Sequence, residues 1–205
     1  MSRRNLSICR GLVAAMAVVL LLGVSQGQSL AQQPSDEQPP SDLLVLGDSL
    51  AVGTMPYLDQ MVPSDVNVTW DAVDGRTTPQ GIDSLRFDLR EVAPEIVAVS
   101  LGSNDGPDPA RFTRRIRALL RDLGPHTCVA WFSIVRPLRK GRYGAMNAAL
   151  RAEARRDPRL VVINWDHAVQ RGTVKLRDGL HATAAGYRYR SSKIVQAVHA
   201  GCPAL

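Results

Sequence analysis

The chain has 205 residues, which is about one domain's length and enough for a single sizeable core. Hydrophobic residues make up 45% of the chain and charged residues 21%, which excludes a fibrous, collagen-like or wholly disordered protein. The formal net charge of +6 falls to about +3 without residues 1–31, so composition gives no reason to expect a nucleic-acid partner.

The N-terminus has the three parts of a secretory signal peptide. Arginines precede an apolar run at residues 11–25, and a small-x-Ala site ends at Ala31. A membrane-spanning helix needs about 20 apolar residues, more than this run provides. We therefore expect residues 1–31 to be cleaved and the protein to be secreted or extracytoplasmic, in the periplasm or cell envelope. An uncleaved anchor is the alternative.

Two further features depend on export. Residues 32–41 are rich in Pro and Gln, which is typical of a polar linker, and they precede a domain at residues 42–205. Cleavage leaves two cysteines, Cys128 and Cys202, and an even pair in an oxidising compartment favours a disulfide. The alternative is two unrelated buried thiols. Neither cysteine has metal-ligand spacing, so we expect no metal ion.

From Asp42 onward, short apolar runs alternate with helical stretches. In chain order, strands are expected at residues 42–47, 66–73, 95–102, 128–135 and 160–165. Helices are expected at residues 78–92, 110–124, 143–156 and 184–201, with their scattered basic side chains on solvated faces. Continuously apolar strands fit a parallel sheet buried on both faces. The sequence thus predicts an α/β fold, a three-layer α/β/α sandwich with about five parallel strands.

Polar clusters lie where this fold places its sites, at the carboxyl ends of strands. The first strand ends in Gly-Asp-Ser-Leu at residues 47–50, and the second leads into Asp-Gly-Arg at 74–76. The third ends in Gly-Ser-Asn-Asp at 102–105, and Asp-Gly-Leu-His at 178–181 precedes the last helix. We expect these clusters to converge on one rim.

Each cluster has a chemical and a plainer interpretation. Ser49 at a strand-to-helix turn is a candidate nucleophile, but a Ser or Asp there is often only a helix cap. Asp178 can orient the imidazole of His181, three residues later, as the base. Gly75 and Asn104 offer an N–H and an amide that could complete an oxyanion hole with the Ser49 N–H. Alternatively, Gly75 is a turn glycine and Asn104 a loop cap.

The four clusters, in this order and placement, resemble the four sequence blocks of the SGNH (GDSL) hydrolase family over about residues 42–201. The resemblance implies a flavodoxin-like fold and a serine esterase without cofactors. It also implies a catalytic triad of Ser49, Asp178 and His181, and an oxyanion hole of Ser49, Gly75 and Asn104. Residues 75–86, Asn147 and the segment Asn164–Asp166 look like SGNH domains joined to membrane acyltransferases in actinobacterial cell-envelope proteins.

Other classes fit the sequence less well. It has no GxSxG elbow of the α/β-hydrolase fold and no GxGxxG or P-loop motif. A response-regulator receiver would leave the export signal and the Asp-Gly-Leu-His cluster unexplained. A non-catalytic envelope-binding module and an O-acyltransferase acting on cell-envelope polysaccharide remain alternatives. We expect a monomer that cleaves short-chain acyl esters, of small molecules or of a polysaccharide, with possible cell-envelope association.

Overall fold

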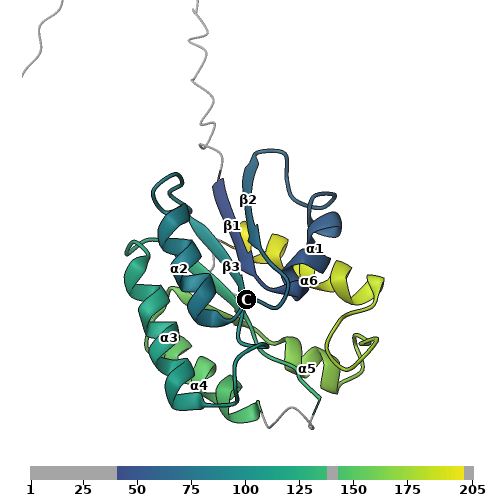
Figure 1. The fold of residues 1–205 in the computed structure, drawn as a ribbon. Coiled ribbons are helices and arrows are strands. Elements are labelled where there is room, and N and C mark those ends of the chain that lie inside the picture. The colour runs from purple at the N-terminus through teal and green to yellow at the C-terminus, as the bar shows by residue number, and fades with distance from the viewer. Residues whose placement is uncertain (1–40, 138–142, 201–205) are drawn as a thin grey trace, which may run out of the picture. The chain divides into compact units, whose positions relative to one another are not determined.

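The computed structural model describes residues 41–137 and 143–200, built around a five-stranded parallel sheet (Figure 1). The strands are β1 (Ser41–Gly47), β2 (Val66–Ala72), β3 (Ile96–Ser100), β4 (Cys128–Phe132) and β5 (Leu160–Ile163). They lie in the order β2-β1-β3-β4-β5, and each pairing is parallel. This is the strand order of flavodoxin-like folds. The predicted sheet is therefore confirmed.

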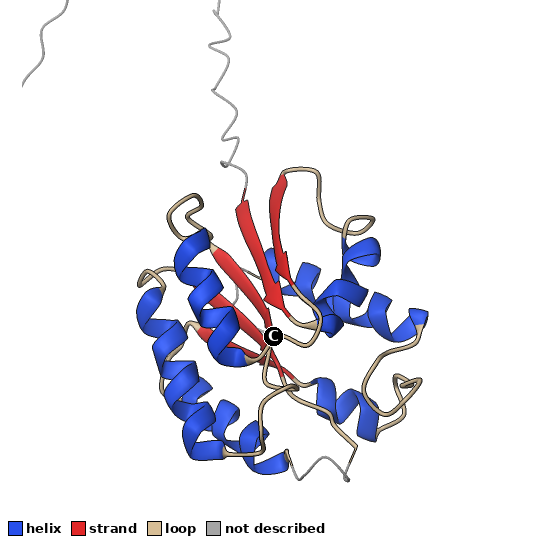
Figure 2. Cartoon of the chain, in the orientation of Figure 1, coloured by secondary structure: helices blue, strands red, loops and turns tan. Residues whose placement is uncertain are grey.

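Helices cover both faces of the sheet and complete the three layers (Figure 2). They are α1 (Ser49–Leu58), α2 (Thr78–Asp88), α3 (Pro109–Asp122), α4 (Gly144–Ala154), α5 (Trp165–Gln170) and α6 (Ala184–His199). One core contains apolar side chains of α2, α3 and α4, and the other contains those of α1, α5 and α6. Alternate residues of each central strand enter the two cores, as Leu44 and Val45 do in β1.

Residue types explain where the helices begin. The side chain of Asp48 accepts a hydrogen bond from the Leu50 N–H at the start of α1, so Asp48 is the N-cap. Asp108 caps α3 in the same way and is followed by a proline at the first helical position. Thr183 caps α6 through the Gly186 N–H. Asp48 directly precedes Ser49, and Thr183 lies two residues after His181, so these caps help to position the site loops.

The structure corrects the last predicted strand. Residues 160–165 were expected to be extended, but β5 ends at Ile163 and α5 begins at Trp165. Trp165 is fully buried in the core on the α6 side of the sheet. Because this residue of α5 is apolar, the hydrophobic run of β5 extends to it in the sequence. The run at residues 128–135 is also shorter as a strand, because β4 ends at Phe132.

The parts of the chain that concern export lie mostly outside the described residues. These parts include the expected signal peptide, the linker up to residue 40, and Cys202. Cys128 is the buried first residue of β4, and its pairing with Cys202 stays a prediction. Within residues 41–137 and 143–200, no helix has the length and apolar character needed to cross a membrane.

Candidate active site

The candidate nucleophile lies at the turn from β1 into α1. Ser49 is the first residue of α1 and is partly exposed. Gly47 is needed just before it, because a Cβ there would lie 2.4 Å from the Cβ of Ala51. The turn can thus pass close under its own helix and present the Ser49 hydroxyl at the carboxyl edge of the sheet. Asp48 is the cap of this helix, whereas the Ser49 side chain is left to contact another loop.

That other loop carries the candidate base. His181 Nε2 lies 3.1 Å from Ser49 Oγ, although the two residues are 132 positions apart in sequence. On the other side of the ring, His181 Nδ1 lies 2.7 Å from Asp178 Oδ2. An ionised carboxylate can only accept, so Nδ1 carries the hydrogen and Nε2 can accept from the serine hydroxyl. The three predicted residues therefore form a continuous Ser–His–Asp chain.

Asp178 is held in place by the backbone of its own loop. Its Oδ1 accepts hydrogen bonds from the Leu180 N–H at 3.0 Å and the His181 N–H at 2.7 Å. Hydrogen bonds from the His181 side chain, then from these N–H groups, hold the pKa of the Asp178 carboxyl well below its usual range. Gly179 makes this tight loop possible with a φ of +81°. Asp178 thus stays ionised and fixes the orientation of the imidazole.

The two other predicted oxyanion donors lie on neighbouring loops. Gly75 follows β2 with a φ of +73°, and a Cβ there would meet no atom within 4 Å. Asn104 follows β3, and its amide donates to the Arg76 carbonyl at 3.1 Å and to Asp48 Oδ2 at 3.3 Å. These bonds join the Gly75 loop, the Asn104 loop and the Ser49 turn. To donate to a bound oxyanion, the Asn104 amide must give up or share one of them.

The network beneath the nucleophile turn contains residues that sequence analysis missed. Asp48 is fully buried, and its carboxylate accepts from the hydroxyls of Ser100 and Ser103 as well as from Asn104. Ser100 in turn accepts from Arg190 of α6 at 2.8 Å. Arg190 is 1% exposed, so the expectation that scattered basic residues lie on solvated helix faces is wrong at this position. Arg190 stands between Tyr189 and Ser191, and this local sequence carries no signal of burial.

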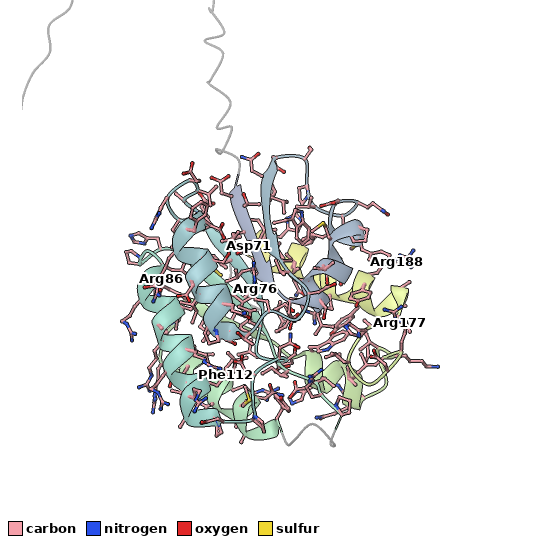
Figure 3. The ribbon with its side chains drawn as sticks, in the orientation of Figure 1. Asp71, Arg76, Arg86, Phe112, Arg177 and Arg188 are labelled. Atoms are coloured by element: carbon pink, nitrogen blue, oxygen red, sulfur yellow. The ribbon has the colours of Figure 1, made fainter. Side chains whose placement is uncertain are left out.

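The Gly75 loop is braced from below by an ion pair. Arg76 Nη2 lies 2.6 Å from Asp71 Oδ1, and Arg76 Nη1 donates to the Asp71 carbonyl at 2.7 Å (Figure 3). Asp88 of α2 shares a hydrogen bond with the Asp71 carboxyl. Burial, and then this contact with Asp71, raises the pKa of Asp88 to about 6. The loop that offers the Gly75 N–H is therefore fixed to β2 by charge.

Comparison with known proteins shows the family of this chain. The model of the GDSL-like lipase/acylhydrolase family matches residues 45–189, a span that contains all five predicted site residues. The chain belongs to this family. An arylesterase from Vibrio mimicus is 35% identical over 89 residues, which are 38% of this chain and 42% of that protein. The match thus spans less than half of that relative's length.

Solved structures agree on the GDSL fold. A lipase/acylhydrolase from Enterococcus faecalis has a TM-score of 0.66 at 20% identity, covering 78% of this chain and 96% of that chain. The C-terminal catalytic domain of peptidoglycan O-acetyltransferase A from Streptococcus pneumoniae has a TM-score of 0.64 at 17% identity. That match covers 78% of this chain and 93% of the other. At these identities the likeness shows the fold alone.

The residues of the finer resemblance form a second polar network in this GDSL domain. Asn147 of α4 bonds both the N–H and the carbonyl of Ile134, at 2.7 and 2.8 Å, and donates to Asp166 Oδ2 at 3.1 Å. Arg151 and Ser133 also donate to Asp166, each at 2.6 Å for the closest contact. Burial alone would raise the pKa of Asp166, but these hydrogen bonds lower it on balance. The network fixes the segment that follows β4.

Two cavities accompany these loops. A cavity of about 500 Å³ lies beside the segment after β4, with a mainly apolar wall. Its lining is Ile134, Val135, Arg136, Tyr143, Gly144, Ala145, Asn147, Asp166, Val169 and Gln170. The same segment reaches the triad loop, because a Cβ on Gly179 would lie 2.9 Å from Pro137. A smaller cavity of about 240 Å³ includes Gly75 and Arg76 in its lining.

Metal chemistry has no candidate site in the part of the chain that the structure describes. Across residues 41–137 and 143–200, no group of three or more His, Cys, Asp or Glu side chains is placed to hold a metal ion. Ser49, His181 and Asp178 are the candidate reacting groups of the described site.

Proposed function

We propose that this protein is an exported serine esterase that hydrolyses short-chain acyl esters through an acyl-enzyme on Ser49. The single observation that carries the proposal is the hydrogen-bonded chain from Ser49 Oγ through His181 to Asp178. A serine hydroxyl is a weak nucleophile until a neighbouring base accepts its proton, and His181 Nε2 is within reach to do so. Membership of the GDSL-like lipase/acylhydrolase family supports the same chemistry.

In the first half-reaction, Ser49 Oγ attacks the acyl carbonyl carbon while its proton moves to His181 Nε2. The N–H groups of Ser49 and Gly75 and the Asn104 amide stabilise the oxyanion of the tetrahedral intermediate. The intermediate collapses when the bond to the leaving oxygen breaks, and His181 gives its proton to the departing alkoxide. Asp178 remains ionised throughout and stabilises the imidazolium.

In the second half-reaction, a hydroxyl group attacks the acyl-enzyme and loses its proton to His181. The second tetrahedral intermediate then releases the acyl group, and Ser49 Oγ recovers the proton from the imidazolium. If the attacking group is water, the product is a carboxylic acid. If it is a sugar hydroxyl, the product is a new ester, and the protein is an acyltransferase.

Transfer to a cell-envelope polysaccharide is the second candidate function. It is favoured by the likeness in fold to the catalytic domain of a peptidoglycan O-acetyltransferase. The expected signal peptide would place the protein where such polymers occur. The cavity of about 500 Å³ beside the segment after β4 has room for a sugar as well as for an alcohol leaving group. We keep hydrolysis as the main proposal because it needs no acceptor site.

The experiment is a panel of p-nitrophenyl esters from acetyl to dodecanoyl, assayed with and without chitooligosaccharide as acceptor. Release of p-nitrophenol that is fastest with acetyl or butyryl esters and yields free acid supports the short-chain esterase. Mass-spectrometric detection of acylated sugar as the main product would replace it with acyl transfer. Absence of turnover by wild-type protein with every ester would contradict both. The same panel is assayed with Ser49→Ala, which should lose turnover. Its matched control is Ser64→Ala, which changes an exposed serine in the connection between α1 and β2.

A further inference from the structure

Arg190 is a buried cation next to the candidate active site. It lies on α6 with 1% of its surface exposed, and its Cζ is 3.8 Å from the centre of the Phe132 ring. Its Nε donates to the Thr54 hydroxyl at 3.3 Å. Among the described residues, no Asp or Glu forms a direct ion pair with it. A buried charge without a paired charge is costly, so a requirement other than packing has to favour an arginine here.

The nearest negative charge that could favour an arginine here is the Asp48 carboxylate, which Arg190 contacts through the Ser100 hydroxyl. Arg190 Nη2 donates to Ser100 Oγ at 2.8 Å, and Ser100 Oγ donates to Asp48 Oδ1 at 3.3 Å. A guanidinium can only donate, so Ser100 accepts from Arg190 and has its single hydrogen left for Asp48. This chain of hydrogen bonds thus directs a hydrogen at Asp48 Oδ1, an arrangement that suits an ionised carboxylate.

The other contacts of Asp48 also place donors around its two carboxylate oxygens. It accepts from the Leu50 N–H of α1 at 3.0 Å, and from Ser103 and Asn104 of the loop after β3. Burial raises the pKa of Asp48 above its usual range, and these hydrogen bonds and the charge of Arg190 limit that rise. Of the side chains from α6, β3 and this loop that face Asp48, Arg190 is the charged one. Arg190 itself also faces the Tyr187 hydroxyl.

We propose that Arg190 is a positioning residue for the reaction at Ser49: its charge, relayed by Ser100, keeps Asp48 in the ionised form that holds the Asn104 amide and the nucleophile turn in place. This inference rests on the proposed esterase. Arg190 touches no reacting atom. It acts because a neutral Asp48 would carry a hydrogen on an oxygen that now accepts. On Oδ2, that hydrogen would make the Ser103 hydroxyl or the Asn104 amide, both on the loop after β3, turn away. Displacement of an oxyanion donor lowers kcat more than it changes KM.

The kinetic test compares Arg190→Met, Arg190→Lys and Ser100→Ala with the control Arg117→Met. Arg117 is also an arginine that joins two elements, but it pairs with Glu153 between α3 and α4, away from Asp48. We expect Arg190→Met to lower kcat for p-nitrophenyl acetate by about 10²-fold with little change in KM. Arg190→Lys should recover at least about tenfold of this loss because it keeps the charge. Arg117→Met should retain wild-type kcat.

The pH profile separates the charge from a purely structural role. Without the cation, Asp48 takes up a proton at higher pH, so the loss of kcat in Arg190→Met should deepen as pH falls from 9 to 6. In an Asp48→Asn background there is no carboxylate to keep ionised, and Arg190→Met should then add little further loss. A loss that is equal at all pH values, and unchanged in the Asp48→Asn background, would overturn the proposal.

A spectroscopic measurement is independent of ester turnover. The side-chain 13C resonance of Asp48, assigned with Asp48→Asn, reports its protonation directly. We expect its midpoint in Arg190→Met to lie at least about one pH unit above that of wild type and Arg190→Lys. Identical midpoints would overturn the proposal even if the protein is an esterase. If Arg190→Met does not fold, Ser100→Ala, which should give a smaller shift in the same direction, carries the test. If wild-type protein turns over no ester, the proposed function fails. The change in the Asp48 midpoint still shows whether Arg190 keeps Asp48 ionised.

Discussion

At the scale of single residues, Asn104 is the donor whose role can be measured most simply. Its amide is close to the nucleophile turn because it bonds Asp48, and close to the Gly75 loop because it bonds the Arg76 carbonyl. Asn104→Ala should lower kcat by about 10²–10³-fold with a much smaller change in KM, because the lost interaction is strongest in the transition state. A change confined to KM would instead make Asn104 a substrate-binding residue.

Gly75 offers a second test at this scale, because the strain of its positive φ can be measured without a steric clash of an added side chain. A Cβ at Gly75 or at Gly144 would meet no atom within 4 Å, but Gly75 alone of the two has a positive φ, +73°. Gly75→Ala should therefore cost about 1 kcal/mol of unfolding free energy and lower kcat by moving the N–H donor. Gly144→Ala, at the start of α4, should be neutral or stabilising. Equal effects in urea unfolding of the two variants would contradict the assigned strain.

At the scale of elements, the contact between β2 and α2 should make stability depend on pH. The pKa of Asp88 is about 6 in the folded protein, above the ordinary aspartate value of 3.8. The folded state therefore binds this proton more tightly, and its stabilising contribution is present below about pH 4 and is lost as pH rises through 6. Asp88→Asn, which can donate permanently to Asp71, should raise Tm at pH 8 and change it little at pH 4.

The control for this prediction lies on the same helix. Asp83→Asn removes an exposed partner of Arg86 on α2, a pair that is expected to contribute little. Its effect on Tm should be small and the same at both pH values. If Asp88→Asn and Asp83→Asn shift Tm alike at pH 4 and pH 8, the proton shared by Asp71 and Asp88 does not link this contact to pH.

The elements also show what the sequence could predict and what it could not. The strands were predictable because a parallel sheet covered on both faces leaves continuous apolar runs such as residues 43–46. The boundary between β5 and α5 was missed because Trp165 is apolar in either element. Asp48, Ser100 and Arg190 meet only in three dimensions, across 52 and 90 positions. Short motifs therefore predict the residues at the rim of the site, but not those that support them from beneath.

The topology of the whole molecule explains why distant motifs form one site. β1 lies between β2 and β3, so the chain passes from β1 to β2 on one side of it and then crosses to β3 on the other side. In such folds the loops at this switch point diverge, and ligands bind in the crevice at the carboxyl edge of the sheet. Ser49 and Asn104 follow β1 and β3 there, and His181 precedes the helix that packs beside α1. The fold thus supplies proximity that the sequence order conceals.

Export and the predicted disulfide can be tested on the whole molecule with one measurement. Intact-mass analysis of secreted protein should give a chain that starts at about Gln32. Alkylation under denaturing conditions should add nothing before reduction and two groups after it, because Cys128 and Cys202 would be joined. Full-length chain recovered from the cytoplasm would contradict the signal peptide. Two groups added before reduction would rule out the disulfide.

The central claim is that Ser49 is the nucleophile, and the most direct measurement is fluorophosphonate labelling combined with p-nitrophenyl acetate hydrolysis in Ser49→Ala. Ser49 Oγ lies 3.1 Å from His181 Nε2, the geometry that a base-activated hydroxyl requires. We predict that folded Ser49→Ala loses both labelling and hydrolysis, while Ser64→Ala keeps both. Wild-type rates of labelling and hydrolysis in Ser49→Ala would show that another residue performs the reaction.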